Sequence, residues 1–577
     1  MRTRSKIGLS VALLASSAAL ITACGGSSGL NQLSVAQGAT FAGDCTALTA
    51  KVSGLANTTV SAINTIAAGT LKAGTQDIPE HCQVLGKMYQ RTSPVDGNSY
   101  AIGFEMRLPK NWNGRFFHQG NGGTDGAVLT ALGALGGGPV TNALLQGFAV
   151  LSSDAGHSGS APDFGVDPQA RLDYGYQAVG KLTPMAKSVI QAAYGKGPDR
   201  SYFGGCSNGG RHALVTASRY ADDYDGILAG APGYNLPKAA VANLTGARLY
   251  ATAATSSSVA TSIDLATAFT DTERKLLASR VLAKCDALDG ATDGLVQDVA
   301  ACQAAFSLAN DVPTCTASRD GTCLSATQKT AIAKIYSGPT TSDGKLIYAS
   351  FPYDAGVGGG ASGIPGSGIA FWEFFASLNL DAGATGIIFQ VPPLSPVGFN
   401  GPNFALTTNI DNLYSAIFAT NGTYTESAMS FMTPPNATQM TRLRERGGKI
   451  MVYHGTSDPI FSVNDSEAWY KGIADNNGAF AQQFTRFYRV PGMGHCSGGP
   501  ATDQFDMLTP LVNWVEKGQV PDAIVATARG AGNAGGVNTD VPASWAANRT
   551  RPLCAYPQVA RYKGTGSLED AANFACQ

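Results

Sequence analysis

Two pairs of neighbouring residues constrain the fold more than any other feature of this chain. Cys206 precedes Ser207, and Cys496 follows His495. A disulfide between the two cysteines would hold their Cα atoms about 4.4–6.8 Å apart, so that Ser207 and His495 would lie side by side. At that distance an imidazole can take a proton from a serine hydroxyl. If the bond forms, the chain must bring two distant segments to one point.

The cysteine count agrees with folding in an oxidising compartment. The sequence has 11 cysteines, and removal of Cys24 leaves ten (11 − 1), an even number suited to five disulfides. No two cysteines are spaced as Cys-x-x-Cys, so neither a zinc ribbon nor a thioredoxin-type site is expected. The sequence does not fix the pairing, but proximity suggests four bonds and leaves Cys206 and Cys496 for each other: Cys45–Cys82, Cys285–Cys302, Cys315–Cys323 and Cys554–Cys576.

Residues 1–23 are predicted to be a signal peptide of the lipoprotein type. Three basic residues precede an apolar run over residues 7–21, which is too short for a membrane span. The run ends at Cys24 in a pattern that resembles a lipidation site; ordinary cleavage nearby, with loss of Cys24, is the alternative. Residues 24–44 are then a flexible tether. We expect an exported protein, either a periplasmic or outer-membrane lipoprotein or a secreted one, with membrane contact only through such an anchor.

Composition excludes some partners. The formal net charge of −1 and a charged fraction of 14% leave no electrostatic footprint for nucleic acid. A chain of 577 residues is also too long for one compact core, so a large domain with a second domain or a major insertion is expected.

The order of predicted elements indicates a mostly parallel α/β sheet. Predicted strands alternate with helices between residues 100 and 230, and the same texture returns at residues 449–454 and 484–490. The stretch between is punctuated by Gly and Pro and carries cysteine-bearing loops. We therefore predict an α/β-hydrolase fold with a large inserted lid domain, divided as 45–234 (first part of the hydrolase domain), 235–445 (lid) and 446–577 (second part).

Ser207 is the predicted nucleophile. A Gly-x-Ser-x-Gly match is weak by itself in a chain with 70 glycines, and residues 25–29 match it too. Ser207, however, follows a predicted strand at 201–203 and precedes a predicted helix from 209, the setting of a nucleophile elbow. The alternative is a glycine-rich strand-to-helix turn without catalysis.

An acid and a histidine should follow the serine in the chain. Asp458 lies on the loop after the strand at 449–454, and His495 follows the strand at 484–490. We predict Ser207 as nucleophile, His495 as general base and then acid, and Asp458 as the group that holds the imidazole tautomer. His454 is interpreted as a strand-end histidine with satisfied hydrogen bonds.

An oxyanion hole needs two preorganised N–H donors. The backbone N–H of Asn208, directly after the nucleophile, is the predicted first donor. The second should come from the glycine-rich loop 120–123 after an early strand. A simple hairpin turn is the alternative interpretation of that loop.

Together these motifs resemble the tannase and feruloyl esterase family. The resemblance rests on Gly-Cys-Ser-x-Gly-Gly around Ser207, an Asp after His454-Gly455, and Gly-His-Cys-Ser-Gly-Gly around His495, and it extends from about residue 45 to 576. It implies a disulfide between Cys206 and Cys496 and places the second oxyanion donor at Gly123. It also implies a carboxylic ester hydrolase that cleaves small esters of aromatic acids, of the feruloyl, galloyl or terephthalate monoester type, through an acyl-enzyme.

The resemblance further implies a structural calcium site in the lid. Residues 285–295 match the acidic loop of the family. Carboxylates and backbone carbonyls are the oxygen ligands that Ca²⁺ takes in proteins, whereas the residues alone favour a solvated turn. The predicted ligands are Asp286, Asp289, Ala291, Asp293 and Leu295.

Two questions stay open from the sequence. The aromatic cluster Phe371, Trp372, Phe374 and Phe375, or Phe389, is either core or a platform for the substrate ring. The activity could also be that of another α/β-hydrolase, a lipase or peptidase, or the chain could be a lipid-anchored binding protein with a dead site. The intact set of Ser207, Asp458 and His495 speaks against the last alternative.

Overall fold

The computed structural model describes Met1 and residues 30–135, 141–256, 261–359 and 368–577. Residues 2–23 of the predicted signal peptide, and Cys24, therefore lie outside the described residues. Within them, no helix is both long and apolar enough to cross a membrane.

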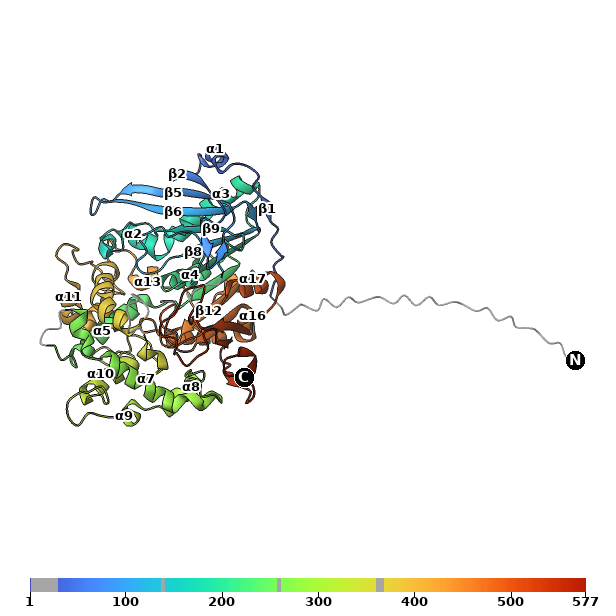
Figure 1. The fold of residues 1–577 in the computed structure, drawn as a ribbon. Coiled ribbons are helices and arrows are strands. Elements are labelled where there is room, and N and C mark those ends of the chain that lie inside the picture. Colours follow the sequence, from blue (N-terminus) through green and yellow to red (C-terminus); the bar gives the residue numbers. More distant parts are fainter. Residues whose placement is uncertain (2–29, 136–140, 257–260, 360–367) are drawn as a thin grey trace.

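The centre of the molecule is a twisted sheet, which has nine strands in the described residues (Figure 1). Strands β9, β8, β10, β11, β12 and β13 are parallel, and β6, β5 and β2 extend the sheet in antiparallel pairing. In spatial order the strands are β13 (Thr485–Val490), β12 (Lys449–Gly455), β11 (Gly226–Gly230), β10 (Arg200–Cys206), β8 (Arg115–Gly120), β9 (Ala149–Ser153), β6 (Ser99–Pro109), β5 (His81–Thr92) and β2 (Thr58–Ile66).

Apolar side chains on both faces explain why these strands lie inside. Every residue of β11 and β12 is buried, as expected for parallel strands covered by helices on both sides. One face packs on α3 (Ala178–Tyr194), α4 (Asn208–Arg219) and α15 (Val463–Asn477), and the other on α17 (Leu508–Lys517). The predicted α/β architecture is confirmed.

A largely helical segment is inserted between β11 and β12, and Figure 1 shows it beside one end of the sheet. Its longer elements are α5 (Leu236–Ala251), α7 (Asp271–Cys285), α10 (Ala326–Tyr336) and the π-helical turns η6 (Ala370–Asp381) and η7 (Ala384–Phe389). The shorter ones are α6 (Ser262–Ala266), η4 (Asp286–Asp289), α8 (Val299–Ala305), α9 (Leu308–Asp311), η5 (Ala355–Gly358), α11 (Gly401–Thr407), α12 (Ile410–Ala416), α13 (Ala428–Met432) and α14 (Thr441–Glu445).

The core of this inserted segment is shared with the rest of the chain. Leu244, Phe374 and Phe431 lie in it, but the same apolar cluster includes Phe164 and Tyr174, which precede the insertion. Ile460 and Phe461, from the loop after β12, also belong to the cluster. The lid boundaries of 235 and 445 stay a prediction.

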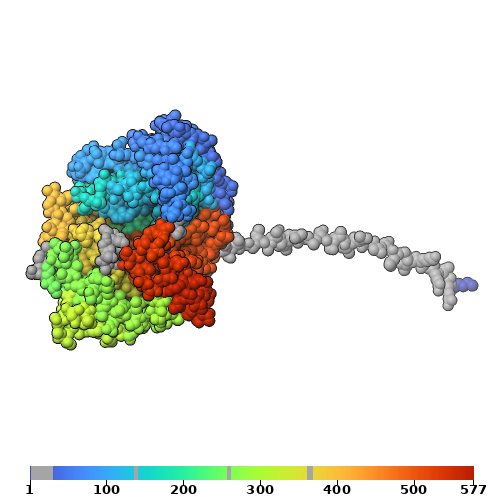
Figure 2. All heavy atoms as spheres, viewed as in Figure 1, coloured from blue at the N-terminus to red at the C-terminus, as the bar shows by residue number. Residues whose placement is uncertain are grey.

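Short elements complete the fold. The small helices outside the insertion are η1 (Cys45–Ala47), α1 (Leu48–Val52), η2 (Pro162–Val166), α2 (Pro168–Leu172), η3 (Asp173–Gln177), η8 (Gly478–Phe480), α16 (Ala481–Phe484) and η9 (Ala571–Asn573). The remaining strands pair two by two: β1 (Ala39–Thr40) with β7 (Asn111–Trp112), β3 (Lys72–Ala73) with β4 (Gln76–Asp77), β14 (Ala523–Thr527) with β15 (Thr550–Cys554), and β16 (Ala560–Tyr562) with β17 (Phe574–Cys576). In Figure 2 the C-terminal residues (red) lie on the visible face between the N-terminal strands (blue) and the insertion (green).

The described part of the chain contains five disulfides, and they join the pairs that proximity suggests: Cys45–Cys82, Cys206–Cys496, Cys285–Cys302, Cys315–Cys323 and Cys554–Cys576. The Cα atoms of Cys206 and Cys496 are 6.1 Å apart. This bond joins the end of β10 to the loop after β13, so the two segments discussed first do meet.

Candidate active site

Ser207 lies in the sharp turn between β10 and α4. Its backbone has φ 65° and ψ −127°, a conformation that L residues rarely adopt and that is found at strained functional turns. A Cβ atom at Gly205 would lie 2.4 Å from the carbonyl oxygen of Gly120, and one at Gly209 would lie 2.3 Å from the same oxygen. The flanking glycines therefore let the turn press against the loop after β8.

The side chains of Ser207, His495 and Asp458 form one line of hydrogen bonds. His495 Nε2 is 2.8 Å from Ser207 Oγ, and His495 Nδ1 is 2.7 Å from Asp458 Oδ2. His495 and Asp458 are buried, and Ser207 is partly exposed. The structure brings together the three residues predicted as the triad, because each follows the carboxyl end of a strand in one parallel sheet.

The acid is held as a carboxylate. Burial alone would raise the pKa of Asp458, but the charges of His495 and His454 and their hydrogen bonds hold that pKa well below its usual range. Its other oxygen accepts the backbone N–H groups of Ile460 and Phe461, each at 3.0 Å. An ionised acceptor at Nδ1 fixes the tautomer in which Nε2 can take a proton from the serine.

His454 has satisfied hydrogen bonds, as its strand-end position suggests, but it also touches the acid. Its Nδ1 is 2.8 Å from Ser466 Oγ, and its Nε2 is 2.9 Å from the carbonyl oxygen of Phe461 and 3.2 Å from Asp458 Oδ2. The contact with Asp458 was not foreseen. The only trace of it in the sequence is the four-residue spacing between the two side chains.

The loop after β8 passes over the nucleophile. A Cβ atom at Gly122 would lie 3.8 Å from Ser207 Cβ, and Gly123 has φ 62° with open space where a side chain would be. Asn208 begins α4 and is buried. Both predicted oxyanion donors thus belong to segments next to Ser207; their role stays a prediction.

Asp125, which lies in no motif of the sequence, connects this loop to α4. Its Oδ2 accepts the side-chain N–H of Asn208 at 2.8 Å and lies 2.9 Å from His212 Nε2. Burial raises the pKa of Asp125 to about 7. One carboxylate therefore connects the loop of Gly123 to the first turn of the helix that follows the nucleophile.

The aromatic cluster divides between core and site. Trp372 packs edge-on against the ring of His495 with centroids 4.7 Å apart, and Phe461 does so at 5.4 Å. Phe374 and Phe389 are fully buried in the core shared by the insertion. Phe371 stacks on Phe375, which is exposed. Of the rings considered as a substrate platform, Trp372 is the one that packs against His495.

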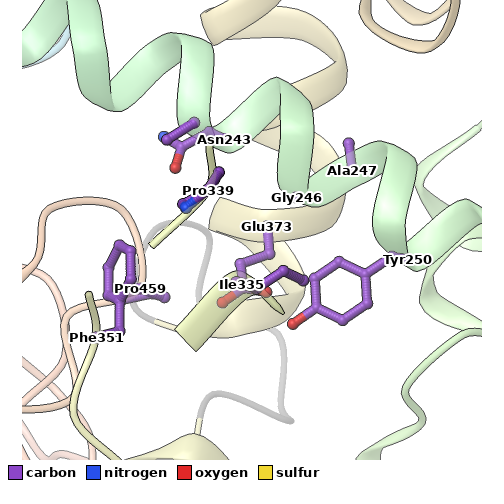
Figure 3. A pocket seen from close by; sticks show the side chains of 10 residues that line it. Asn243, Gly246, Ala247, Tyr250, Ile335, Pro339, Phe351, Glu373 and Pro459 are labelled. Atoms are coloured by element: carbon purple, nitrogen blue, oxygen red, sulfur yellow. The ribbon is translucent and has the colours of Figure 1, made fainter. Parts of the chain in front are cut away.

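Two cavities lie behind the acid rather than over the serine. The first, with about 340 Å³ of empty volume, is drawn in Figure 3, where Glu373 lies between Tyr250 and Pro459. The second, of similar volume, is lined by Asp354, Thr456, Ser457 and Asp458 among others. Neither lining includes Ser207 or His495. Both lie between the insertion and the loop that carries Asp458.

The acidic loop in the insertion contains three buried carboxylates. Asp286 Oδ1 accepts the backbone N–H of Asp293 at 2.9 Å, and Asp289 Oδ1 accepts that of Ala291 at 2.8 Å. Asp289 Oδ2 is buried without a hydrogen-bond partner, whereas Asp293 Oδ2 is held by Arg551. Burial, followed by the charges of Asp293 and Asp286, raises the pKa of Asp289 to about 7.

These features fit a cation only in part. The unpartnered oxygen of Asp289 and the mutual repulsion of the carboxylates favour one. Within the described ranges, however, no group of three or more His, Cys, Asp or Glu side chains is arranged to hold a metal ion. Backbone carbonyls, such as those predicted at Ala291 and Leu295, would have to complete the shell.

The geometry defines the class of protein. A parallel sheet with a nucleophile elbow after β10, an acid after β12 and a histidine after β13 is the arrangement of an α/β-hydrolase. The chain belongs to the tannase and feruloyl esterase family, whose model, described as "Tannase and feruloyl esterase", matches residues 82–577. The resemblance and the fold class are thereby confirmed, and the chain is a carboxylic ester hydrolase of this type.

Individual relatives agree with the family. The mono(2-hydroxyethyl) terephthalate hydrolase of Piscinibacter sakaiensis is 39% identical over 540 residues, which cover 88% of this chain and 87% of that protein. A probable feruloyl esterase B-1 of Neosartorya fischeri is 28% identical over 531 residues, 89% of each chain. The solved feruloyl esterase B of Aspergillus oryzae shares the fold, with a TM-score of 0.71 at 24% identity over 92% of this chain and 99% of that one.

Proposed function

We propose that this protein is an exported serine esterase that cleaves small esters of aromatic acids through an acyl-enzyme on Ser207. One observation carries the proposal: the unbroken hydrogen bonding from Ser207 Oγ through His495 to Asp458, at 2.8 and 2.7 Å. A histidine that contacts both a serine and a buried carboxylate is the arrangement that activates a hydroxyl as a nucleophile.

Each residue has a defined role in the proposed mechanism. His495 Nε2 takes the proton of Ser207 Oγ as that oxygen attacks the ester carbonyl, and the N–H groups of Gly123 and Asn208 stabilise the oxyanion. The carbon–oxygen bond to the leaving group breaks, and His495 gives its proton to the departing alcohol. Water, deprotonated by the same imidazole, then attacks the acyl carbon. The bond between that carbon and Ser207 Oγ breaks, the aromatic acid leaves, and the proton returns from His495 to Ser207 Oγ. Asp458 stays ionised and stabilises the imidazolium.

The aromatic acyl preference has two supports. Trp372 is a large ring at the catalytic histidine, where it can cover a flat acyl group. The relatives named above act on esters of terephthalic and ferulic acid, as their names state. Residues 383–403 contain no arginine to pair with a free substrate carboxylate. We therefore propose feruloyl and galloyl esters as substrates on an equal footing with the terephthalate monoester.

A substrate panel with a nucleophile variant tests the proposal. Methyl ferulate, methyl gallate, the terephthalate monoester, a triglyceride and a peptide are compared on purified enzyme, with Ser207→Ala as the control. We expect hydrolysis of aromatic esters and covalent labelling by a fluorophosphonate only with Ser207 present. Preference for acyl chains or peptides would favour the lipase or peptidase alternative, and no labelling of the wild type would favour a binding protein.

We also propose that Ca²⁺ binds the loop 286–295 and stabilises the insertion. The support is the unpartnered Oδ2 of Asp289 beside two other carboxylates. Asp286, Asp289 and Asp293 would supply side-chain oxygens, and Ala291 and Leu295 backbone carbonyls; the ion would hold the loop without taking part in the reaction.

Chelation tests the calcium proposal by thermal unfolding. We expect EDTA to lower the Tm of the wild type, added Ca²⁺ to restore it, and Asp289→Ala to remove this response. Asp320→Ala, an exposed acid of the same segment, is the matched control and should respond like the wild type. A wild-type Tm that is the same with EDTA and with Ca²⁺ would contradict the site.

The cellular location is proposed from the cysteines. Disulfides persist in oxidising compartments, and the described residues hold five. Cleavage after residue 23 and lipidation of Cys24 remain part of the proposal. Expression of the full chain and of Cys24→Ala, followed by membrane fractionation, tests the anchor: loss of membrane association in the variant alone is the expected result.

A further inference from the structure

One carboxylate from the inserted segment reaches both loops that carry the acid and the histidine. Asp354 directly precedes η5 and is buried, with 2% of its surface exposed. Its Oδ2 accepts hydrogen bonds from Thr456 Oγ1, from Ser457 Oγ at 2.9 Å and from the backbone N–H of Gly492 at 3.0 Å. Its Oδ1 accepts the N–H of Ala355 at 2.7 Å.

The partners of Asp354 stand next to the proposed triad. Thr456 and Ser457 are the two residues before Asp458, and Gly492 lies three residues before His495. The two loops also bond each other, because Ser457 N donates to the carbonyl oxygen of Met493 at 3.0 Å. Asp354 therefore sits where the loop of the acid meets the loop of the histidine.

Close packing leaves this junction little freedom. A Cβ atom at Gly356, two residues after Asp354, would lie 2.3 Å from Ser457 Oγ and 2.6 Å from the carbonyl oxygen of Gly492. On its other side Asp354 is fixed through its neighbour Tyr353, whose backbone N–H and carbonyl both bond the side chain of Gln303 at 2.8 and 3.0 Å. Gln303 follows Cys302, which is bonded to Cys285.

We propose that Asp354 is a positioning residue for the reaction. It holds the two loops in register, so that Asp458 Oδ2 and His495 Nδ1 stay at hydrogen-bonding distance. The Cys206–Cys496 disulfide ties the serine to the histidine, and Asp354 ties the histidine to the acid. Displacements of about 1 Å at such contacts cost roughly 100-fold in rate, so small shifts of either loop matter. The inference rests on the proposed triad.

The variant Asp354→Asn tests it with little change of shape. The amide keeps one acceptor, but it loses the charge and presents a donor to the surrounding N–H and O–H groups. We expect kcat on a small aryl ester to fall by about 10–100-fold, with KM within about twofold. Asp225→Asn is the matched control, because Asp225 is also buried and accepts a backbone N–H, that of Ser201 at 2.8 Å, at the amino end of β11. Its kcat should stay within about twofold of the wild type.

A second variant removes the partners instead of the carboxylate. Thr456→Val with Ser457→Ala deletes both hydroxyl donors and should lower kcat in the same way. Combined with Asp354→Asn it should add little further loss, because contacts within one network are not additive. The double variant decides the question if Asp354→Asn does not fold.

The outcomes separate this inference from the proposed function. If Ser207→Ala is inactive but Asp354→Asn or the hydroxyl variant keeps kcat within twofold of the wild type, the positioning role is wrong, whatever happens to Tm. If Ser207→Ala remains active, the proposed function fails first. A fall in kcat with unchanged KM, absent in Asp225→Asn, supports the role.

Discussion

Asp458 is the side chain on which most contacts of the site converge. Two histidines reach the same carboxylate oxygen, and two backbone N–H groups reach the other. Burial alone would raise the pKa of this carboxyl, but the charges and hydrogen bonds of His495 and His454 hold it well below that of a free aspartate. The contacts around Asp458 therefore favour its ionised form.

Asp458→Asn should therefore be far more damaging than its small change of shape suggests. The amide replaces one of the two acceptor oxygens with an N–H donor, although one oxygen faces His495 and the other accepts backbone N–H groups. An amide N–H facing His495 favours the wrong imidazole tautomer. We expect kcat to fall by about 10³–10⁴-fold with little change in KM. The measurement is steady-state hydrolysis of an aryl ester, with circular dichroism to verify folding. More than a tenth of the wild-type kcat would contradict the role of Asp458.

At the scale of elements, η6 contains both the ring that packs against His495 and a buried carboxyl group. It carries Trp372 towards His495 and buries Asp381, which accepts one hydrogen bond from Asn243 at 3.1 Å. Burial raises the pKa of Asp381 to about 8. A single amide donor does not replace the lost hydration of a carboxylate, so the charged form destabilises the insertion.

The sign of the pH effect follows from the two pKa values. In the unfolded chain Asp381 titrates near 4, so between about pH 4 and 8 the folded state binds the proton more tightly and stability falls as pH rises. Asp381→Asn removes this contribution. We expect its Tm to exceed that of the wild type by about 2–4 °C at pH 8.5 and the difference to shrink at pH 5.

Thermal melts of three proteins at both pH values check this prediction. The exposed Asp475→Asn serves as the control and should follow the wild type at each pH. A Tm difference between Asp381→Asn and the wild type that is the same at pH 5 and pH 8.5 would mean that the charge of Asp381 is not its cause.

At the scale of the whole molecule, one disulfide closes a loop of about half the chain. Cys206–Cys496 spans 290 residues, whereas Cys315–Cys323 spans 8. The loss of chain entropy in the unfolded state predicts roughly 5–6 kcal/mol for the long loop and roughly 2–3 kcal/mol for the short one, as upper values. The long link also borders Ser207 and His495, so its effects on stability and on catalysis should coincide.

Removing each disulfide in turn separates the two roles. Cys206→Ala with Cys496→Ala should lower the free energy of unfolding by about 2–5 kcal/mol and also reduce kcat. Cys315→Ala with Cys323→Ala is the matched control, with a smaller loss of stability and unchanged kcat. Urea unfolding and aryl ester hydrolysis measure both effects. Undiminished activity in the first variant would show that the bond does not hold Ser207 and His495 in register.

Local motifs account for what could be predicted from the sequence. The strand–turn–helix around Ser207 and the loops after β12 and β13 are read from contiguous residues, so the fold class and the three aligned side chains were within reach. Boundaries were less exact: the strand expected at 201–203 extends over Arg200–Cys206, and the one expected at 484–490 begins at Thr485. The strands β2 and β5, ahead of the first predicted strand, were missed.

Contacts between distant segments account for what could not be predicted. Asp125 and Asp354 lie outside any motif, and their importance follows only from which side chains they meet. The contact of His454 with Asp458 likewise appears only in the folded chain. Asp354 and Gly492 are 138 residues apart. The division of the aromatic cluster had the same cause, since a run of rings in sequence does not show which ring faces His495.

The apolar cluster that crosses the borders of the insertion bears on how new specificities could be engineered. Phe164 and Tyr174 precede the inserted segment, and Ile460 and Phe461 follow it, yet all four pack into its interior. Consider a chimera in which only the residues between β11 and β12 are exchanged with those of a homologous esterase. The new segment would pack poorly against these four side chains and leave apolar surface exposed. Grafts should carry the flanking stretches 157–177 and 456–461 as one cassette.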